Sequence, residues 1–248
     1  NVDQLKEKGF VFKEDLDYGK AHAVPSWEDP VTYIVFGEDP RDSYSFAGLA
    51  AQYAYCLRIA EKQTGQSYEK IIKDYQQASI RAYEWAEQNA QPGDRDFPGG
   101  SHNYGSFKNA KLIGATWLYK LTGKKQYHDD LMKLMPAYAA TNYDLGDDRW
   151  AVWAYSLIDD ENKLYKNTFD KTLQEKLAEA SLAYAREQVT NAIDSGRSMR
   201  WGSSWNKSIQ NNHGTTPLIM PAAVASELAK RAQLASYEYF LSACYTTA

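Results

Sequence analysis

The sequence lacks the features that mark several common protein classes. Its 248 residues include only two cysteines, Cys56 and Cys244, and they form no CxxC pair. Isolated cysteines exclude a disulfide-stapled scaffold, and because each falls in a helical pattern, both are predicted to be buried free thiols. No apolar run approaches the roughly 18 residues of a membrane-spanning helix, and no segment has the pattern of a signal peptide. The sequence therefore predicts a globular chain with no membrane partner.

An excess of one charge is also missing. The chain has 28 Lys+Arg against 32 Asp+Glu, a formal net charge of -4. A nucleic-acid-binding surface or a polybasic membrane patch needs a cluster of basic residues, and no such cluster occurs. We therefore expect neither nucleic acid nor a membrane as a partner, and a neutral polar ligand fits the charge balance best.

Aromatic residues, by contrast, are abundant, with 7 Trp, 19 Tyr and 8 Phe. Two of the tryptophans lie close together in the segment Arg200-Trp201-Gly202-Ser203-Ser204-Trp205. An indole is costly to leave in water unless it stacks on a flat partner. This segment is a candidate surface for stacking on a sugar ring.

Helical periodicity dominates the chain from Ser43 onward. The first helix, predicted over 43–64, carries an apolar stripe that is expected to face the core. The stripe consists of Phe46, Leu49, Ala50, Tyr53, Ala54, Leu57 and Ala60. Further helices are predicted at about 67–89, 108–122, 126–140, 149–159, 168–192, 208–229 and 231–246. Residues 1–42 are predicted to be an extended, loop-rich lead-in, and residues 43–248 a series of helical hairpins within one domain.

One local pattern occurs twice. Gly65 follows a helical stretch and is followed by Tyr68, and Gly123 is followed in the same way by Tyr127. Each glycine falls where a helix C-cap needs a left-handed residue, and each tyrosine is expected to pack across a helical hairpin. Repeated hairpins with almost no strand signal predict an all-α toroid or solenoid rather than a four-helix bundle.

Several short motifs follow one another along the chain in a fixed order. They are Phe10-Val11-Phe12-Lys13, Pro25-Ser26-Trp27-Glu28-Asp29, Ser45-Phe46-Ala47-Gly48-Leu49-Ala50-Ala51, Tyr119-Lys120-Leu121-Thr122-Gly123, Arg200-Trp201-Gly202-Ser203 with Asn211-Asn212, and residues 242–248. In sequence and in order they resemble glycoside hydrolase family 9, the inverting cellulases. The resemblance implies an (α/α)6 barrel, a helical toroid with its binding cleft at one end, of which this chain covers the central portion.

The resemblance also shows which motifs are missing. Family 9 takes its catalytic base from an Asp-Ala-Gly-Asp motif and its acid from a glutamate beyond an LGRNP region, and neither occurs in residues 1–248. Inverting hydrolysis needs two carboxyl groups, roughly 6.5–9.5 Å apart. The resemblance thus implies that the catalytic carboxylates lie outside this chain.

A second segment imitates the missing base motif. If residues 14–20 corresponded to that motif, Glu14 and Asp17 would be the catalytic residues. The segment lies too close to the helix that begins near Ser43, because the family places a whole helical hairpin between the two. Glu14 and Asp17 therefore remain weak catalytic candidates. We expect this segment to correspond to a loop that follows the base motif in the family.

No metal or cofactor is expected. Residues 108–120 match a family hairpin that holds calcium, but Asn109 and Ala110 replace its two acidic ligands, so the site is predicted to be lost. Asp147 and Asp148 precede a helix, where carboxylates are expected to serve as caps. The histidines are scattered without the spacing of a zinc site. They are His22, His102, His128 and His213.

Five side chains are predicted to contact the substrate. They are Trp201, Trp205, Tyr104, His22 and Trp27. The resemblance places Trp201 at the position of a cleft tryptophan, Trp205 where relatives carry arginine, and Tyr104 where some relatives carry an aromatic residue. His22 and Trp27 match the cleft edge only to within a residue or two, so a structural role stays open for them. The remaining helical tryptophans are predicted to be core residues. They are Trp85, Trp117 and Trp153.

These patterns predict a secreted or periplasmic/extracellular glycoside hydrolase that cleaves β-1,4-linked glucan with inversion of configuration. Its partner would be a polysaccharide or oligosaccharide. Two alternatives stay open. One is an exo-acting glucosaminidase or cello-oligosaccharide hydrolase with the same fold and a blocked cleft. The other is a non-catalytic sugar-binding toroid that kept its aromatic floor and lost its acids.

Overall fold

The computed structural model describes residues 6–9, 11, 39–90, 107–135, 145, 148–159, 163–165, 168–190 and 216–247. Within these ranges all regular secondary structure is helical, which confirms the all-α class. The elements are α2 (Pro40–Thr64), α3 (Glu69–Asn89), α4 (Phe107–Thr122), α5 (Lys125–Leu134), α6 (Arg149–Ser156), the 3-10 helix η4 (Lys163–Tyr165), α7 (Lys171–Val189), α8 (Thr216–Arg231) and α9 (Tyr237–Thr247). Among the described residues, no helix is both long and apolar enough to cross a membrane.

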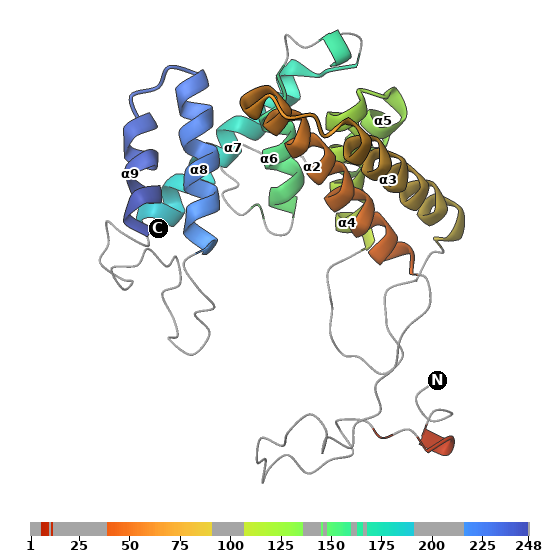
Figure 1. Ribbon diagram of the computed structural model, residues 1–248. Helices are drawn as coiled ribbons and strands as arrows, with labels where there is room; N and C mark the ends of the chain where they lie inside the picture. The colour runs from red at the N-terminus through yellow and green to blue at the C-terminus, as the bar shows by residue number, and fades with distance from the viewer. Residues whose placement is uncertain are drawn as a thin grey trace.

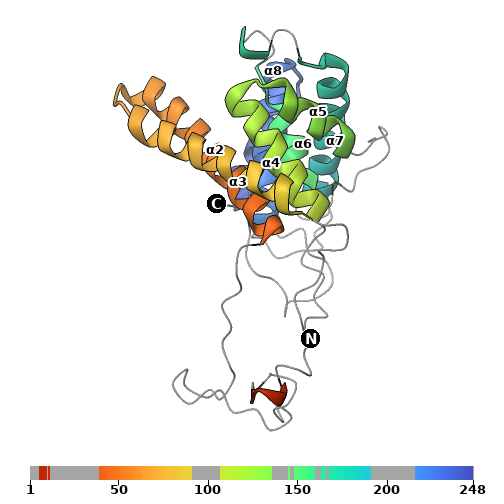
Figure 2. The same ribbon diagram turned by 90° about the vertical axis from the view of Figure 1, so that its right-hand side faces the viewer.

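The helices form an array of antiparallel neighbours. In Figure 1, α2, α4, α6 and α8 begin at the lower edge of the array and end at the upper edge. Helix α4 contacts α2 on one side and α6 on the other, so three of these helices form a continuous row. The odd-numbered helices complete the hairpins, as in the pairs α2 with α3, α4 with α5, and α8 with α9. Figure 2 shows the α2–α3 hairpin at the border of the array, where it projects from the other helices.

Local sequence explains where the first helix starts. The Asp39 side chain accepts a hydrogen bond from the Asp42 backbone N–H at 2.9 Å, and Pro40 occupies the first helical turn. An acidic N-cap followed by proline is a strong helix start, because proline has no N–H to leave unpaired. Helix α2 therefore begins at Pro40, inside the stretch to residue 42 that was predicted to be an extended lead-in.

Both predicted glycine caps are confirmed. Gly65 has φ 70° and Gly123 has φ 66°, and the backbone N–H of each closes the preceding helix by donating to a carbonyl four residues earlier. Tyr127 is fully buried and meets the Tyr83 ring edge-on at 5.3 Å. Tyr68 is half-buried and packs on the same core. The repeated pattern therefore marks two helical hairpins whose first helices end in the same glycine cap, although four residues connect α2 to α3 and two connect α4 to α5.

Two other predicted helix boundaries were wrong. Helix α5 ends at Leu134, with Met135 extended before Pro136, because a residue that precedes proline avoids the helical conformation. Residues 232–236 form a turn in which Gln233 has φ 53°, so α9 begins at Tyr237 rather than near residue 231. The predicted start of the preceding helix near residue 208 lies outside the described residues.

The described helices enclose two hydrophobic cores. The larger core, within α2 to α7 and the end of α8, is rich in buried tyrosine and leucine, including Tyr83, Tyr127 and Leu131. The smaller core lies between α7, α8 and α9, and alanines surround Phe240 in it. Packing in these two cores fixes the positions of α2, α4, α6 and α8 relative to one another, and with them the positions of the helix ends.

The predicted core stripe of α2 is confirmed for Ala50 and Ala54 but was wrong for three of its larger members. Its three largest side chains are substantially exposed, Phe46 by 47%, Leu49 by 64% and Tyr53 by 46%. The buried face of α2 consists of Tyr44, Ala47, Gly48, Ala50, Ala51 and Ala54. Small residues are needed on this face because α4 approaches closely: a Cβ added at Gly48 would lie 3.0 Å from the Ile113 side chain.

The predicted burial of Cys56 fails for the same reason. Cys56 lies on the outward face of α2 and is exposed, whereas Cys244 is partly buried in α9. A helix with small residues on its packing face leaves its larger apolar residues for the other side. Hydrophobicity alone therefore pointed to the wrong face of α2.

Candidate functional site

The residues predicted to touch substrate lie outside the described ranges. They are Trp201, Trp205, Tyr104, His22 and Trp27, together with the weak catalytic candidates Glu14 and Asp17. Their order in the chain is nevertheless informative, because Tyr104 precedes α4, Trp201 and Trp205 precede α8, and the others precede α2. All of these helices begin at one edge of the array (Figure 1). We call the first turns of α2, α4, α6 and α8 the N-terminal edge, and their last turns the C-terminal edge.

A cluster of polar side chains joins three helices near the N-terminal edge. Glu87, in the last turn of α3, accepts a hydrogen bond from the Tyr44 hydroxyl of α2. The Lys111 ammonium of α4 lies 2.6 Å from one carboxylate oxygen of Glu87 and 2.9 Å from the other. Lys111 also lies 5.8 Å from the centre of the Tyr44 ring. One carboxylate thus ties α2, α3 and α4 together.

The electrostatics of this cluster favour a positioning role for Glu87. The Lys111 ammonium and the Tyr44 hydroxyl both donate to its carboxylate, which fixes its position between α2 and α4. Burial raises the pKa of Tyr44, and the hydrogen bond to Glu87 raises it further. Tyr44 therefore stays protonated and continues to donate. The cluster holds the helix starts and does not resemble an acid and base pair.

Tyr83 extends this network to α5. Its hydroxyl donates to Asp130 at 3.1 Å, and its ring meets the Tyr44 ring edge-on at 5.1 Å. Burial raises the pKa of Tyr83, and the negative charge of Asp130 raises it further. Aromatic packing and charge-assisted hydrogen bonds therefore act together in fixing the α2, α3 and α5 helices.

Asn109 lies in the stretch where the resemblance predicts a lost calcium site. Its side-chain amide donates to the Asp148 carboxylate at 2.6 Å, which ties α4 to the start of α6. Asp148 occupies the predicted position at the start of α6, as its N-cap residue, but its side chain makes no capping hydrogen bond, and Asp147 lies outside the described residues. Ala110 is buried in the core. The part of the chain that the structure describes contains no cluster of three metal-ligating side chains, and the loss of calcium stays a prediction.

At the C-terminal edge, Lys120 is an unusually buried cation. Its side chain is 4% exposed, and its ammonium donates to the Ala154 carbonyl at 2.9 Å and to the Leu157 carbonyl at 3.4 Å. The ammonium also lies 5.0 Å from the Tyr55 ring centre and 5.2 Å from that of Trp117. Burial lowers the pKa of Lys120 to about 7. Carbonyls at a helix C-terminus lack partners within the helix, so Lys120 caps α6.

Arginines act in the same way on neighbouring helices. Arg58 of α2 donates to the Leu121 carbonyl at the end of α4 at 2.6 Å, and to the Gln76 side chain at 2.8 Å. Arg231 of α8 donates to the Leu157 carbonyl at 3.4 Å. Sequence reasoning missed these residues. A basic residue within an apolar helical stretch could have indicated such a capping role, because positive charge near a helix C-terminus complements the helix dipole.

His128 also has a structural partner. Its Nε2 lies 3.1 Å from the Tyr155 hydroxyl, which in turn accepts the backbone N–H of Asp170 at 3.1 Å. The imidazole packs against the Tyr119 ring, with centres 4.7 Å apart, and burial lowers the pKa of His128. The histidine thus joins α5 to α6 and to the start of α7.

The helical tryptophans largely follow the prediction that they belong to the core. Trp153 is 4% exposed, which confirms its predicted place. Trp85 and Trp117 are half-buried and pack against the larger core. They therefore support the helix packing without being fully enclosed.

No protein-family model matches the chain, and neither does any curated protein.

Proposed function

We propose that this chain is the helical part of a secreted or periplasmic/extracellular glycoside hydrolase, similar to family 9, that cleaves β-1,4-linked glucan with inversion of configuration. The arrangement of helix starts is the observation that carries the proposal. Helices α2, α4 and α6 lie in a row and begin at one edge together with α8. Every residue predicted to contact sugar belongs to a segment that leads into one of these starts.

The same arrangement supports an (α/α)6 barrel. An inner helix of such a ring packs between two inner neighbours, as α4 does between α2 and α6. Helix α2 packs on α4 with one face and carries Phe46, Leu49 and Tyr53 on its exposed side. Exposed apolar side chains in a row are costly in water, so they support a further helical neighbour for α2 in the complete ring.

The chemistry of inverting hydrolysis determines which roles we propose for the residues inside and outside this chain. Water would attack the anomeric carbon with help from one carboxylate while a second carboxyl protonates the leaving oxygen. We propose that both carboxyls lie outside these 248 residues. Trp201 and Trp205 would provide platforms for sugar rings, and Tyr104, His22 and Trp27 would line the cleft. The Glu87 cluster and the Asn109 to Asp148 hydrogen bond would hold the helix starts that carry these segments.

Replacement of Trp201 tests the binding proposal. Trp201→Ala should weaken cello-oligosaccharide binding by roughly 1–3 kcal/mol, the scale of a lost aromatic contact, with little change in stability. Trp153→Ala is the matched control, because loss of a core tryptophan costs about 3–5 kcal/mol of stability. Calorimetric titration and urea unfolding of both variants separate the two roles. Unchanged affinity with a large stability loss in Trp201→Ala would remove the main support for the proposal.

An activity assay tests the placement of the carboxyls. The 248-residue chain should release no reducing sugar from soluble β-glucan. Release that disappears in a Glu14→Gln, Asp17→Asn double variant would instead place catalysis in residues 14–20. Activity on short oligosaccharides alone, in a longer form that restores the missing motifs, would favour the exo-acting alternative. Binding without hydrolysis in that longer form would favour the non-catalytic toroid.

A further inference from the structure

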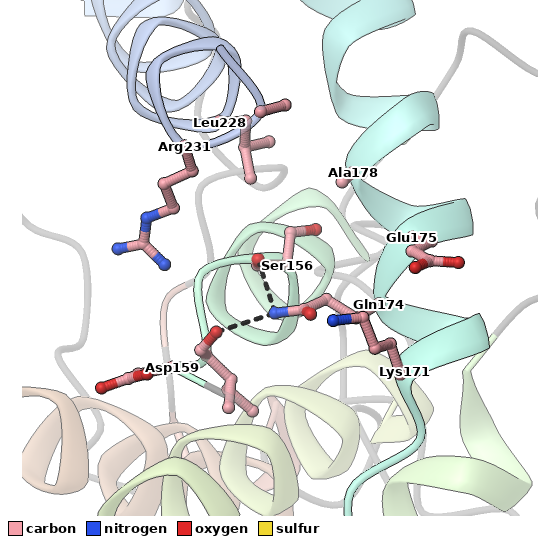
Figure 3. A pocket seen from close by; sticks show the side chains of 10 residues that line it. Ser156, Asp159, Lys171, Gln174, Glu175, Ala178, Leu228 and Arg231 are labelled. Carbon is pink, nitrogen blue, oxygen red and sulfur yellow. Dashed lines mark hydrogen bonds between the residues drawn. The ribbon is translucent and has the colours of Figure 1, made fainter. Parts of the chain in front are cut away.

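A pocket of about 640 Å³ lies at the C-terminal edge, at the opposite end of the helices from the N-terminal edge. The end of α6, the first two turns of α7 and the last turn of α8 enclose it (Figure 3). Its volume falls within the range of roughly 300–1,000 Å³ that is typical of small-molecule sites. The pocket is large enough for one or two sugar rings.

The walls of this pocket are held in place by hydrogen bonds. The Gln174 side-chain amide donates to the Ser156 carbonyl at 3.1 Å and to the Ile158 carbonyl at 2.7 Å, as the dashed lines in Figure 3 show. On the other wall, Arg231 donates to Glu227 at 2.8 Å. Gln174 and Arg231 are therefore held in place at the two walls, which favours a preformed site.

Each side of the pocket carries one cationic and one carboxylate side chain. Figure 3 shows Arg231 and Asp159 on one side, with Lys171 and Glu175 projecting from α7 on the other. An ion bound beside either pair would meet a group of its own charge. A neutral molecule with several hydroxyls can use the cations as donors and the carboxylates as acceptors at the same time. Leu228 and other apolar lining residues can contact the C–H faces of such a molecule.

We propose that this pocket binds a neutral sugar of one or two rings, at a site separate from the predicted cleft. The proposal goes beyond the hydrolase proposal and rests only on the pocket. No aromatic residue is among the lining residues, so the site lacks a stacking platform and gains its affinity from hydrogen bonds. Dissociation constants in roughly the millimolar range are expected for a small ligand held in this way.

Cellobiose is the probe for the test. Hydrogen–deuterium exchange of the 248-residue chain should slow in peptides that cover residues 156–159 and 171–178 when cellobiose is added. Ala178→Phe should fill the pocket and weaken this binding. A Lys171→Met, Glu175→Gln double variant removes the ammonium donor and replaces the charged acceptor with a weaker neutral one, without changing the net charge, and it should weaken binding by about fivefold or more. The control is Lys176→Met, Glu179→Gln, which changes two exposed residues of the same helix outside the pocket and should leave the affinity unchanged.

Three results would overturn the proposal. The first is no protection of these two segments at a cellobiose concentration of roughly 100 mM, well above the expected dissociation constant. The second is equal affinity in the pocket variants and the control. The third is protection by a zwitterion such as glycine betaine and not by cellobiose. Protection confined to other segments is a case of the first result, and it leaves the hydrolase proposal intact. An unaltered cello-oligosaccharide affinity in Trp201→Ala counts against the hydrolase proposal alone. Circular dichroism melting curves establish that each variant is folded.

Discussion

The hairpins α2–α3 and α4–α5 share one local feature, a left-handed glycine that ends the first helix, but differ in their surroundings. A Cβ added at Gly65 would meet nothing within 4 Å, whereas one added at Gly123 would lie 2.3 Å from the Leu164 carbonyl oxygen. Tyr127 after the second turn is fully buried, and Tyr68 after the first is half-buried. The comparison teaches that similar sequences can form the same helix cap while spatial neighbours decide how much each residue contributes to stability.

The positions of the two hairpins explain this difference. Helix α4 has α2 and α6 on its two sides and α5 as its hairpin partner, so the second hairpin is surrounded. The first hairpin lies at the border and keeps an outward face with Phe46, Leu49 and Tyr53. Equivalent substitutions in the two hairpins should therefore have unequal effects.

The largest difference is expected at the tyrosines. Tyr127→Ala should lower the unfolding free energy by about 3–5 kcal/mol, because it leaves a cavity in the larger core. Tyr68→Ala removes a half-buried ring and should cost about 1 kcal/mol. Urea denaturation of both variants measures the comparison. Equal losses would show that the two hairpins are equally buried in solution.

The glycines should follow the same order with smaller effects. Gly65→Ala places a side chain at positive φ in open space, which costs about 1 kcal/mol. Gly123→Ala adds a backbone clash with Leu164 and should cost about 2–4 kcal/mol in total. Thermal and urea unfolding of the two variants would quantify the difference. If Gly123→Ala were no worse than Gly65→Ala, the contact between η4 and the second turn would be absent in solution.

Lys120 gives the second hairpin a pH dependence. Its folded-state pKa is lowered from 10.5 to about 7, so between these values the unfolded chain binds a proton that the folded protein does not. The unfolding free energy should therefore fall as pH decreases from 9 toward 7, by at most about 1.4 kcal/mol per pH unit from this group. Lys120→Met should remove this slope. Lys176→Met, at an exposed position of α7, should retain it, and identical slopes in the two variants would contradict the burial of Lys120.

The smallest effect concerns the exposed face of the first hairpin. Cys56 should react rapidly with a thiol reagent in the folded protein, because its side chain is exposed. Cys244 is partly buried and burial raises the pKa of its thiol, so it should react more slowly. Absorbance after addition of Ellman's reagent to wild type, Cys56→Ser and Cys244→Ser separates the two rates. A slow Cys56 would show that another surface covers this face of α2.

Sequence reasoning succeeded where a feature depends on neighbours along the chain. The all-α class and the positions of most helices follow from periodicity over many residues. The turns at Gly65 and Gly123 follow from the conformational freedom of glycine, which needs no knowledge of the fold. It missed the hydrogen-bond partner of Asp148, because that donor is Asn109, on another helix.

The sequence by itself determined that this protein is helical and where its hairpins turn, because those choices are made by local backbone preferences. Only the tertiary structure decided which face of α2 is buried, since the close approach of α4 at Gly48 admits small side chains and excludes large ones. It also decided that Lys120 is a buried cap of α6, because helices distant in sequence supply the carbonyls and rings around its ammonium. Long-range contacts depend on how complete helices pack, and no short pattern in the chain encodes them.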